Sequence, residues 1–290
     1  MTRQAAQAMN PADYKMVKVN GLNFRVYDEG EPNQPVVLLL HGQPASSEEY
    51  RHNIPALRAA GYRVVVPDLL GAGGSDRPED VSLYTGTKDY EHTLGIMDAL
   101  GIAQFDVVGG DRGSLPAWML TALNPERVRR LVSENLSHLN GFFSAGVEQK
   151  RRSWYMLFFL FDAAEEALKA DDWAMFRAWM EHHPDVDQWI EQFDRPNGLA
   201  GALLNWYRAN MNPDKPATMD PLPDVHQPVL ILYSLNDPYL GPEQLVTGRD
   251  YLKGPVRLQR IEGAGHFIAT NAPRAFNSAV IDFLNAETID

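Results

Sequence analysis

The sequence predicts an α/β protein: a mostly parallel, twisted sheet flanked by helices, with a helical lid inserted between two of its strands. In the first half of the chain, short β-branched or aliphatic runs alternate with longer amphipathic stretches, which is typical of strands joined by helical crossovers. This alternation stops after Leu139 and resumes near residue 228. The sheet is therefore interrupted once and then completed.

The N-terminal strands form a hairpin in this prediction. Residues 16–19 and 22–28 flank Asn20-Gly21, a favoured tight-turn pair. Ser46 or Ser47, followed by two glutamates, predicts the start of a helix that ends at Gly61. Four buried strands, each bounded by glycine, proline or charged residues, are expected at 35–40, 62–67, 105–108 and 128–132.

The second half of the chain divides into a helical insertion and the rest of the sheet. From 144 to 212, aromatic residues, methionine and leucine recur at helical spacing, whereas strands are expected again at 228–234 and 256–261. Helices are expected from about Pro242 and over 272–284. We expect three parts with a proline-rich linker at 212–228: a first core segment at 15–139, a helical cap at 140–222 and a second core segment at 223–290.

Composition excludes several kinds of function. The 290 residues carry a net charge of −12. A protein with this charge is not attracted electrostatically to nucleic acid or to anionic membranes, so we expect neither as a partner. The absence of cysteine excludes disulfides, thiolate nucleophiles and zinc–thiolate sites. The first residues lack the apolar core of a secretory signal, and the longest apolar runs are only strand-sized. We therefore expect a soluble, cytoplasmic protein.

The segment after the strand at 105–108 has the form of a nucleophile elbow. It contains Gly109, Asp111 and Gly113 in a Gly-x-Asp-x-Gly pattern, followed by a helical stretch. Such a strained turn needs small residues two before and two after the nucleophile, which it presents above the sheet. An aspartate at this position is either a nucleophile or an ordinary helix N-cap. The pentapeptide alone does not separate these two readings.

Other motifs favour catalysis. His41-Gly42-Gln43-Pro44 follows the strand at 35–40, where hydrolases of this topology place an oxyanion loop. The backbone amides of Gln43 and Arg112 are the candidate oxyanion donors, and His41 is expected to hold the loop. The glycine-rich stretch 68–76 lacks both a Walker lysine and a dinucleotide fingerprint, so no nucleotide site is expected.

Two further residues complete a candidate triad in the order nucleophile, acid, histidine. His266 follows a strand in a glycine-rich loop, and Asp237 follows the strand at 228–234. Glu134, after the strand at 128–132, competes with Asp237 for the role of the acid that orients the imidazole.

From about Lys15 to Leu284, this combination resembles the α/β-hydrolase superfamily, and within it the epoxide hydrolases and dehalogenases whose nucleophile is aspartate. Gly-x-Ser-x-Gly, the pattern of serine esterases, does not occur. The resemblance implies that Asp111 attacks a saturated carbon to form an ester, and that His266 activates the water that hydrolyses it. It implies no cofactor and no metal. In this superfamily, Asn-Asp-Pro is the commoner pattern of the loop that carries the acid, and the resemblance therefore favours Asp237.

Residues of the insertion indicate whether the leaving group is an epoxide oxygen or a halide. The segment Leu203 to Arg208 resembles the part of epoxide hydrolases that holds a ring-opening tyrosine, which maps to Tyr207. Trp154 to Phe159 is similar to the segment with the second tyrosine, which maps to Tyr155. The resemblance therefore implies an epoxide hydrolase that makes a vicinal diol from a small, apolar epoxide.

Two alternatives stay open from the sequence. The first alternative is a hydrolytic dehalogenase. Haloalkane dehalogenases usually have Trp directly after the nucleophile, where this chain has Arg112. Fluoroacetate-type dehalogenases have Asp-Arg-Gly there, as this chain does. The second arginine and the His-Trp pair of the latter are replaced here by Leu115, Met156 and Leu157. The other alternative is a catalytically silent ligand-binding protein. The sequence does not distinguish a monomer from a homodimer.

Overall fold

The computed structural model describes residues 9–181, 183–211 and 221–288, and its centre is an eight-stranded sheet. The strand order is β1-β2-β4-β3-β5-β6-β7-β8. β2 runs antiparallel to β1 and β4, and all other neighbours are parallel, which confirms the predicted mostly parallel sheet. The strands are β1 (Tyr14–Val19), β2 (Leu22–Glu29), β3 (Val36–Leu40), β4 (Arg63–Pro67), β5 (Phe105–Gly110), β6 (Val128–Glu134), β7 (Val229–Tyr233) and β8 (Val256–Arg260).

All eight predicted strands are present. The hairpin turn has Asn20 and Gly21 at φ angles of 50° and 86°, the left-handed conformation that a type I′ turn requires at both positions. β5 and β6 are each two residues longer than expected, because their pairing continues through Gly110 and Glu134. Both strands therefore lead directly to predicted site residues.

The prediction of a single helix between Ser47 and Gly61 is wrong, because this segment forms two separate helical pieces. Ser46 accepts a hydrogen bond from the Glu48 amide, as a cap should, but only a short 3₁₀ turn, η2 (Ser47–Tyr50), follows. A separate helix, α1 (Ile54–Ala59), then begins with Pro55 in its first turn. Proline has no N–H to continue the helical hydrogen bonding, so the chain restarts there.

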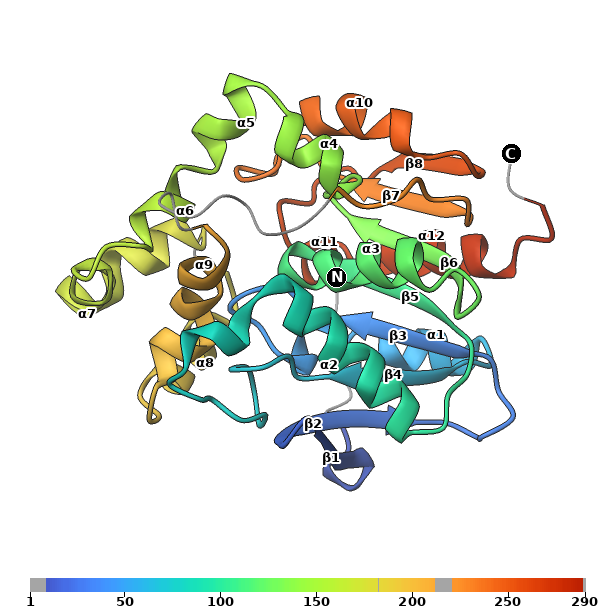
Figure 1. Ribbon diagram of the computed structural model, residues 1–290, viewed down its shortest axis with the longest axis horizontal. Coiled ribbons are helices and arrows are strands. Elements are labelled where there is room, and N and C mark those ends of the chain that lie inside the picture. Colours follow the sequence, from blue (N-terminus) through green and yellow to red (C-terminus); the bar gives the residue numbers. More distant parts are fainter. Residues whose placement is uncertain (1–8, 182, 212–220, 289–290) are drawn as a thin grey trace, which may run out of the picture.

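Helices cover both faces of the sheet (Figure 1). On one face lie α2 (Gly86–Ala99) and α3 (Ser114–Leu123); on the other lie α1 and α12 (Pro273–Asn285). Strands β3, β4 and β7 are almost entirely apolar, whereas β6 and β8 also carry arginine. Alternate residues of the central strands contribute to two separate cores: Leu38 and Val107 to one, Leu39 and Val108 to the other. This packing gives the site a rigid base.

Between β6 and β7 the described residues form helices and turns and no strand, as predicted. These helices lie beyond the arrowheads of β3 and β7, over the carboxyl ends of the parallel strands (Figure 1). Helix α4 (Leu139–Ser144) packs on α10 (Glu243–Gly248), where the Thr247 hydroxyl donates to the Gly141 carbonyl over 2.7 Å. The elements are α4 (Leu139–Ser144), α5 (Val147–Arg152), α6 (Trp154–Phe158), α7 (Ala164–Trp179), α8 (Val186–Phe193), a π-helical turn η5 (Ala200–Leu204) and α9 (Asn205–Asn210).

Two features of the insertion differ from a simple helical bundle. α7 is interrupted, because Asp171, Asp172 and Trp173 adopt positive φ angles. Residues 212–220, which make up more than half of the expected linker, lie outside the described residues.

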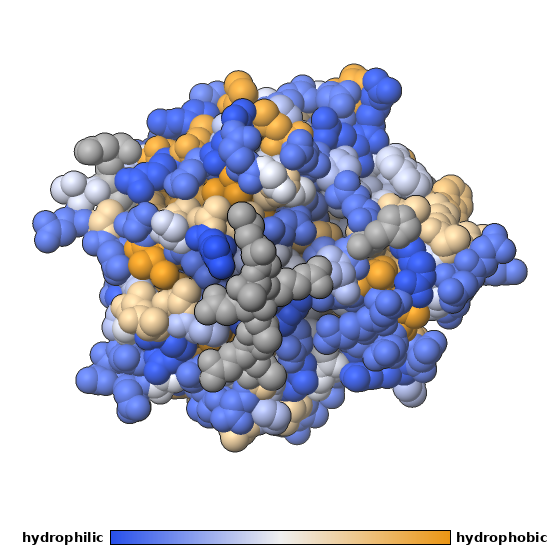
Figure 2. Space-filling model, turned by 180° about the vertical axis from the view of Figure 1, so that it is seen from behind, coloured by the Kyte–Doolittle hydropathy of each residue, from blue (hydrophilic) through white to orange (hydrophobic). Residues whose placement is uncertain are grey.

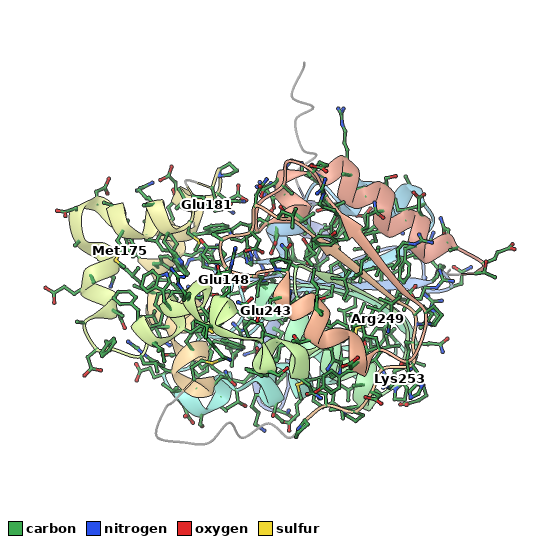
Figure 3. All side chains as sticks on the ribbon, turned by 90° about the horizontal axis from the view of Figure 1, so that it is seen from above. Glu148, Met175, Glu181, Glu243, Arg249 and Lys253 are labelled. Atoms are coloured by element: carbon green, nitrogen blue, oxygen red, sulfur yellow. The ribbon has the colours of Figure 1, made fainter. Side chains whose placement is uncertain are left out.

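Figures 2 and 3 show the molecule from two further sides. From above, Met175 of the insertion lies toward one end and Lys253 of the core toward the other, with Glu148 and Glu243 between them (Figure 3). The rear face is mostly hydrophilic, with hydrophobic residues in small separate groups (Figure 2).

No helix in the described part of the chain is long and apolar enough to cross a membrane. The described residues include no group of three or more His, Asp or Glu arranged to hold a metal ion.

Candidate active site

Asp111 occupies a strained turn directly after β5. Its φ angle is +47°, in the left-handed region that side chains rarely adopt. A Cβ at Gly109 would lie 2.5 Å from the Gly113 carbonyl oxygen, and one at Gly113 would lie 2.1 Å from that of Leu40. The two glycines are therefore a steric requirement of the turn, as the nucleophile-elbow pattern predicts.

The Asp111 carboxylate is held by two groups from distant parts of the chain. Its Oδ1 accepts a hydrogen bond of 2.8 Å from the Gln43 amide, and its Oδ2 lies 3.4 Å from His266 Nε2. Burial acts to raise the pKa of Asp111, but the hydrogen bond and charge of His266, with the amides of Gln43 and Arg112, outweigh it and lower the pKa. Asp111 is therefore ionised at neutral pH.

His266 lies between two carboxylates. Its Nδ1 is 2.8 Å from Asp237 Oδ2, and the other oxygen of Asp237 accepts from the amides of Tyr239 and Leu240 over 2.7 and 3.0 Å. Burial acts to lower the pKa of His266, but the charges and hydrogen bonds of Asp237 and Asp111 raise it well above its usual value. The resting group is an imidazolium.

Glu134 is placed differently from the competing acid Asp237. Its carboxylate accepts from the Tyr50 hydroxyl over 3.3 Å and from the Ala269 amide over 3.1 Å, and it makes no hydrogen bond to His266. Glu49 lies nearby and accepts from the Gly42 amide over 2.9 Å. Burial raises the pKa of Glu134 to about 7; burial and the charge of Glu134 raise that of Glu49 to about 8. The structure thus brings Asp237 to the imidazole and leaves Glu134 beside another acid.

The loop after β3 connects the sheet to the insertion. Leu69 N–H donates to His41 Nε2 over 2.9 Å, and His41 Nδ1 is 2.8 Å from the Gly42 carbonyl, so His41 holds the loop as expected. The amide side chain of Gln43 donates to the carbonyls of Ala202 and Leu203 over 3.2 and 3.0 Å. The backbone of Gln43 therefore bonds to Asp111, and its side chain bonds to η5. The sequence does not reveal this second contact.

Arg112 makes a contact that sequence reasoning missed. Its side chain is buried and forms a bidentate ion pair with Asp89 of α2, with distances of 2.8 and 2.6 Å. The indole of Trp206 on α9 donates to the same carboxylate over 2.9 Å. In the sequence, Asp89 is an ordinary acidic residue in the first turn of a helix, where it favours the helix dipole. No local signal distinguishes it from a surface acid.

The two predicted tyrosines come together at the same cavity. Tyr155 on α6 and Tyr207 on α9 are buried, with ring centroids 5.8 Å apart at 83°. Burial, followed by nearby charges that include that of Asp111, raises the pKa of both well above the usual value. Both hydroxyls are therefore protonated and able to donate.

One cavity is lined together by Asp111, Gln43, Arg112, Tyr155 and Tyr207. Its remaining wall is apolar and includes Trp206. The site thus presents one ionised carboxylate, two phenols and a hydrophobic enclosure. The apolar lining residues are Leu115, Leu136, Leu139, Phe142, Phe143, Met156, Met211 and Leu240.

Known proteins are similar to this chain in sequence and in architecture. Epoxide hydrolase A of Mycobacterium tuberculosis is 28% identical over 93% of this chain and 96% of that protein. A structure described as one of novel epoxide hydrolases in metagenomes from hot environments aligns with a TM-score of 0.80 at 28% identity, covering 95% of this chain and 99% of the other. The crystal structure of epoxide hydrolase A from Mycobacterium thermoresistibile aligns with a TM-score of 0.75 at 26% identity, covering 96% and 99%. A family model described as the alpha/beta hydrolase fold matches residues 35–273, and the chain therefore belongs to the α/β hydrolase fold family.

Proposed function

We propose that this protein is an epoxide hydrolase, which converts an uncharged epoxide and water to a vicinal diol through an ester on Asp111. The observation that carries the proposal is the cavity shared by an ionised carboxylate and two protonated tyrosines. The relatives named epoxide hydrolases support the same chemistry. In this proposal, residues 140–222 act as the cap that encloses the substrate.

In the first half-reaction, an Asp111 oxygen attacks an epoxide carbon and the bond from that carbon to the ring oxygen breaks. Negative charge grows on the ring oxygen, and Tyr155 or Tyr207 supplies the proton. The Asp111 charge, which raises the pKa of both tyrosines, disappears as the ester forms. The phenols therefore become stronger acids as the ring opens.

In the second half-reaction, His266 removes a proton from water, which attacks the carbonyl carbon of the Asp111 ester. The amides of Gln43 and Arg112 hold the resulting oxyanion, where one donor is typically worth ~3 kcal/mol. Loss of the Asp111 charge also removes one of the two anions that raise the pKa of His266, so the imidazole can lose its proton after alkylation and then act as a base. The imidazolium proton restores the phenol, and the neutral imidazole then takes a proton from water. When the tetrahedral intermediate collapses, the bond between the carbonyl carbon and the original Asp111 oxygen breaks, and the imidazolium protonates that oxygen as the diol leaves. The water oxygen stays in the carboxyl group, whose remaining proton returns to the imidazole.

The contacts of Arg112 and Trp206 favour an epoxide over a halide. A leaving halide needs free N–H donors, yet the Trp206 indole donates to Asp89. Leu115 and Met156 occupy places where the fluoroacetate-type pattern would have an arginine and a histidine, and both form apolar wall. Arg112, which kept the dehalogenase alternative open, is paired with Asp89.

A single-turnover reaction in heavy-oxygen water tests the ester. We expect the label in the Asp111 carboxylate and not in the first-turnover diol. Label in that diol would mean direct attack by water and would overturn the proposed intermediate.

A substrate panel separates the alternatives. It contains styrene oxide, an aliphatic epoxide, a 1-haloalkane and fluoroacetate, with detection of diol and halide. We expect diol from the epoxides only. Halide release without diol would support the dehalogenase, and no product from any compound would support the silent ligand-binding protein.

A further inference from the structure

Arg112 is the only cationic residue among the described residues that line the cavity, and it is already occupied. Its Nε and Nη2 bind the two oxygens of Asp89, and its Nη1 donates to the Leu70 carbonyl over 3.0 Å. The side chains of Arg112 and Asp89 are each only 1% exposed. The charge of the Arg112 guanidinium is therefore neutralised by a carboxylate of the protein itself, next to the nucleophile.

The charge of the site follows from this pairing. Arg112 and Asp89 sum to zero, and the imidazolium of His266 stands between the two anions Asp111 and Asp237. The formal charge of these five groups is +2 − 3 = −1. A substrate carboxylate would enter an apolar cavity that already carries a net negative charge and whose described lining residues include no unpaired cation, which is a costly arrangement.

We propose that Asp89 is a specificity-determining residue: by neutralising Arg112, it restricts the cavity to uncharged substrates and excludes those that carry a carboxylate next to the reacting carbon. Removing the charge of Asp89 frees a guanidinium, the group best suited to bind a carboxylate with two parallel hydrogen bonds. This inference deepens the proposed function and rests on it for its kinetic readout. Its binding readout does not need turnover.

The test uses ligand pairs that differ mainly in charge. For turnover, the pair is 3-phenylglycidamide and 3-phenylglycidate; for binding by calorimetry, it is 3-phenylpropanamide and 3-phenylpropanoate. We expect the wild type to favour the neutral member of each pair by ~100-fold, since like charges brought together in a binding site cost several kcal/mol. In Asp89→Asn, we expect this preference to fall at least ~10-fold, which corresponds to about 1.4 kcal/mol.

Two control variants separate charge from loosened packing. Asp28→Asn breaks another bidentate pair, between the buried Asp28 and the partly exposed Arg63 at 2.7 and 2.8 Å, and with it the ion pair of Asp28 with Lys15. Arg63 lies at the end of β4 opposite to the site, so this variant should leave the preference unchanged. The double variant Asp89→Leu with Arg112→Leu removes both charges. It should exclude the carboxylates as the wild type does, because no free cation is created. Thermal unfolding of each variant confirms that it is folded.

Several outcomes overturn the inference. A folded Asp89→Asn variant with an unchanged preference would do so, as would a double variant that accepts carboxylates. A wild type that accepts the carboxylates as readily as the amides, or binds neither amide, would contradict it even if Asp89→Asn failed to fold. If the wild type turns over neither epoxide but still binds the amide selectively, the proposed epoxide chemistry fails and the role of Asp89 stands.

Discussion

The two halves of the candidate site are built on different principles. On the sheet side, Asp111, His266 and Asp237 follow strands or the loops beyond them and hold one another by charge, at distances of 2.8 and 3.4 Å. On the cap side, Tyr155 and Tyr207 lie on short helices and are held by packing between aromatic rings. The sheet side therefore contains paired groups of opposite charge, whereas the cap side contains uncharged hydrogen-bond donors.

The contrast shows that partners, more than burial, decide the ionisation of a buried group. Asp111 and Glu134 are both acids at the carboxyl ends of the neighbouring strands β5 and β6. The pKa of Asp111 is lowered because the hydrogen bond and charge of His266, with two amides, outweigh its burial. Burial raises the pKa of Glu134 to about 7, because its bonds to Ala269 and Tyr50 and the charge of His266 offset the burial only in part. Asp111 takes part in both half-reactions. We expect His266 and Asp237 to control ester hydrolysis, and the two tyrosines of the cap side to assist ring opening by Asp111.

The largest effect is expected for His266→Ala. It removes the base of the second half-reaction but leaves Asp111 and both tyrosines in place, so turnover should fall by at least ~10⁴-fold. Intact-protein mass spectrometry should then detect the alkylated Asp111 ester. Normal turnover in this variant would exclude His266 as the base.

Replacing the tyrosine hydroxyls should affect the other half-reaction. We expect Tyr155→Phe and Tyr207→Phe each to slow ester formation by up to ~10²-fold, and the double variant to lose nearly all ring opening, because the two donors share one oxygen. Stopped-flow measurement of ester formation and of its hydrolysis separates the two steps. Ring opening at the wild-type rate in the double variant would refute the role of the cap side.

The two candidate acids give a direct comparison within the sheet side. Asp237→Asn should lower turnover by ~10³-fold, because it removes the charge that orients and stabilises the imidazolium. Glu134→Gln should lower it less than ~10-fold, since Glu134 bonds to Tyr50 and Ala269. Steady-state kinetics of both variants should give this ranking, and the reverse order would assign the role to Glu134.

The smallest effect concerns stability. Folding raises the pKa of Glu49 to about 8 and that of Glu134 to about 7 from an ordinary value of 4.5. The folded state holds these protons more tightly than the unfolded state, so their contribution to stability is fully present below about pH 4.5 and is lost as the pH rises from there through about 7 to 8. We expect the free energy of unfolding to decline less steeply over this range in Glu49→Gln than in the wild type.

Urea denaturation at about pH 5 and about pH 8.5 measures this slope. Glu31→Gln, at an exposed position, is the matched control and should behave as the wild type. Equal slopes in Glu49→Gln and the control would show that the buried acids do not titrate in this range.

Much of the architecture could be predicted because its signals are local. The turn at Asn20-Gly21, the apolar strands and the spacing of Gly109, Asp111 and Gly113 each depend on neighbours a few residues away. The break before Pro55 also has a local cause, since a proline without an N–H starts a new helix, and it could have been predicted.

By itself, the sequence determined the class of fold, the elbow and the order of the candidate triad, because periodicity and turn chemistry are properties of short segments. Only the tertiary structure decided which acid faces His266, that Glu49 lies beside Glu134, and that Asp89 occupies Arg112. These contacts join residues far apart in the chain: the Trp206 indole reaches Asp89 across 117 positions, and Asn135 reaches the His266 carbonyl across 131. Such pairs depend on how strands and helices pack, and a buried charge takes its chemistry from the partner that this packing brings to it.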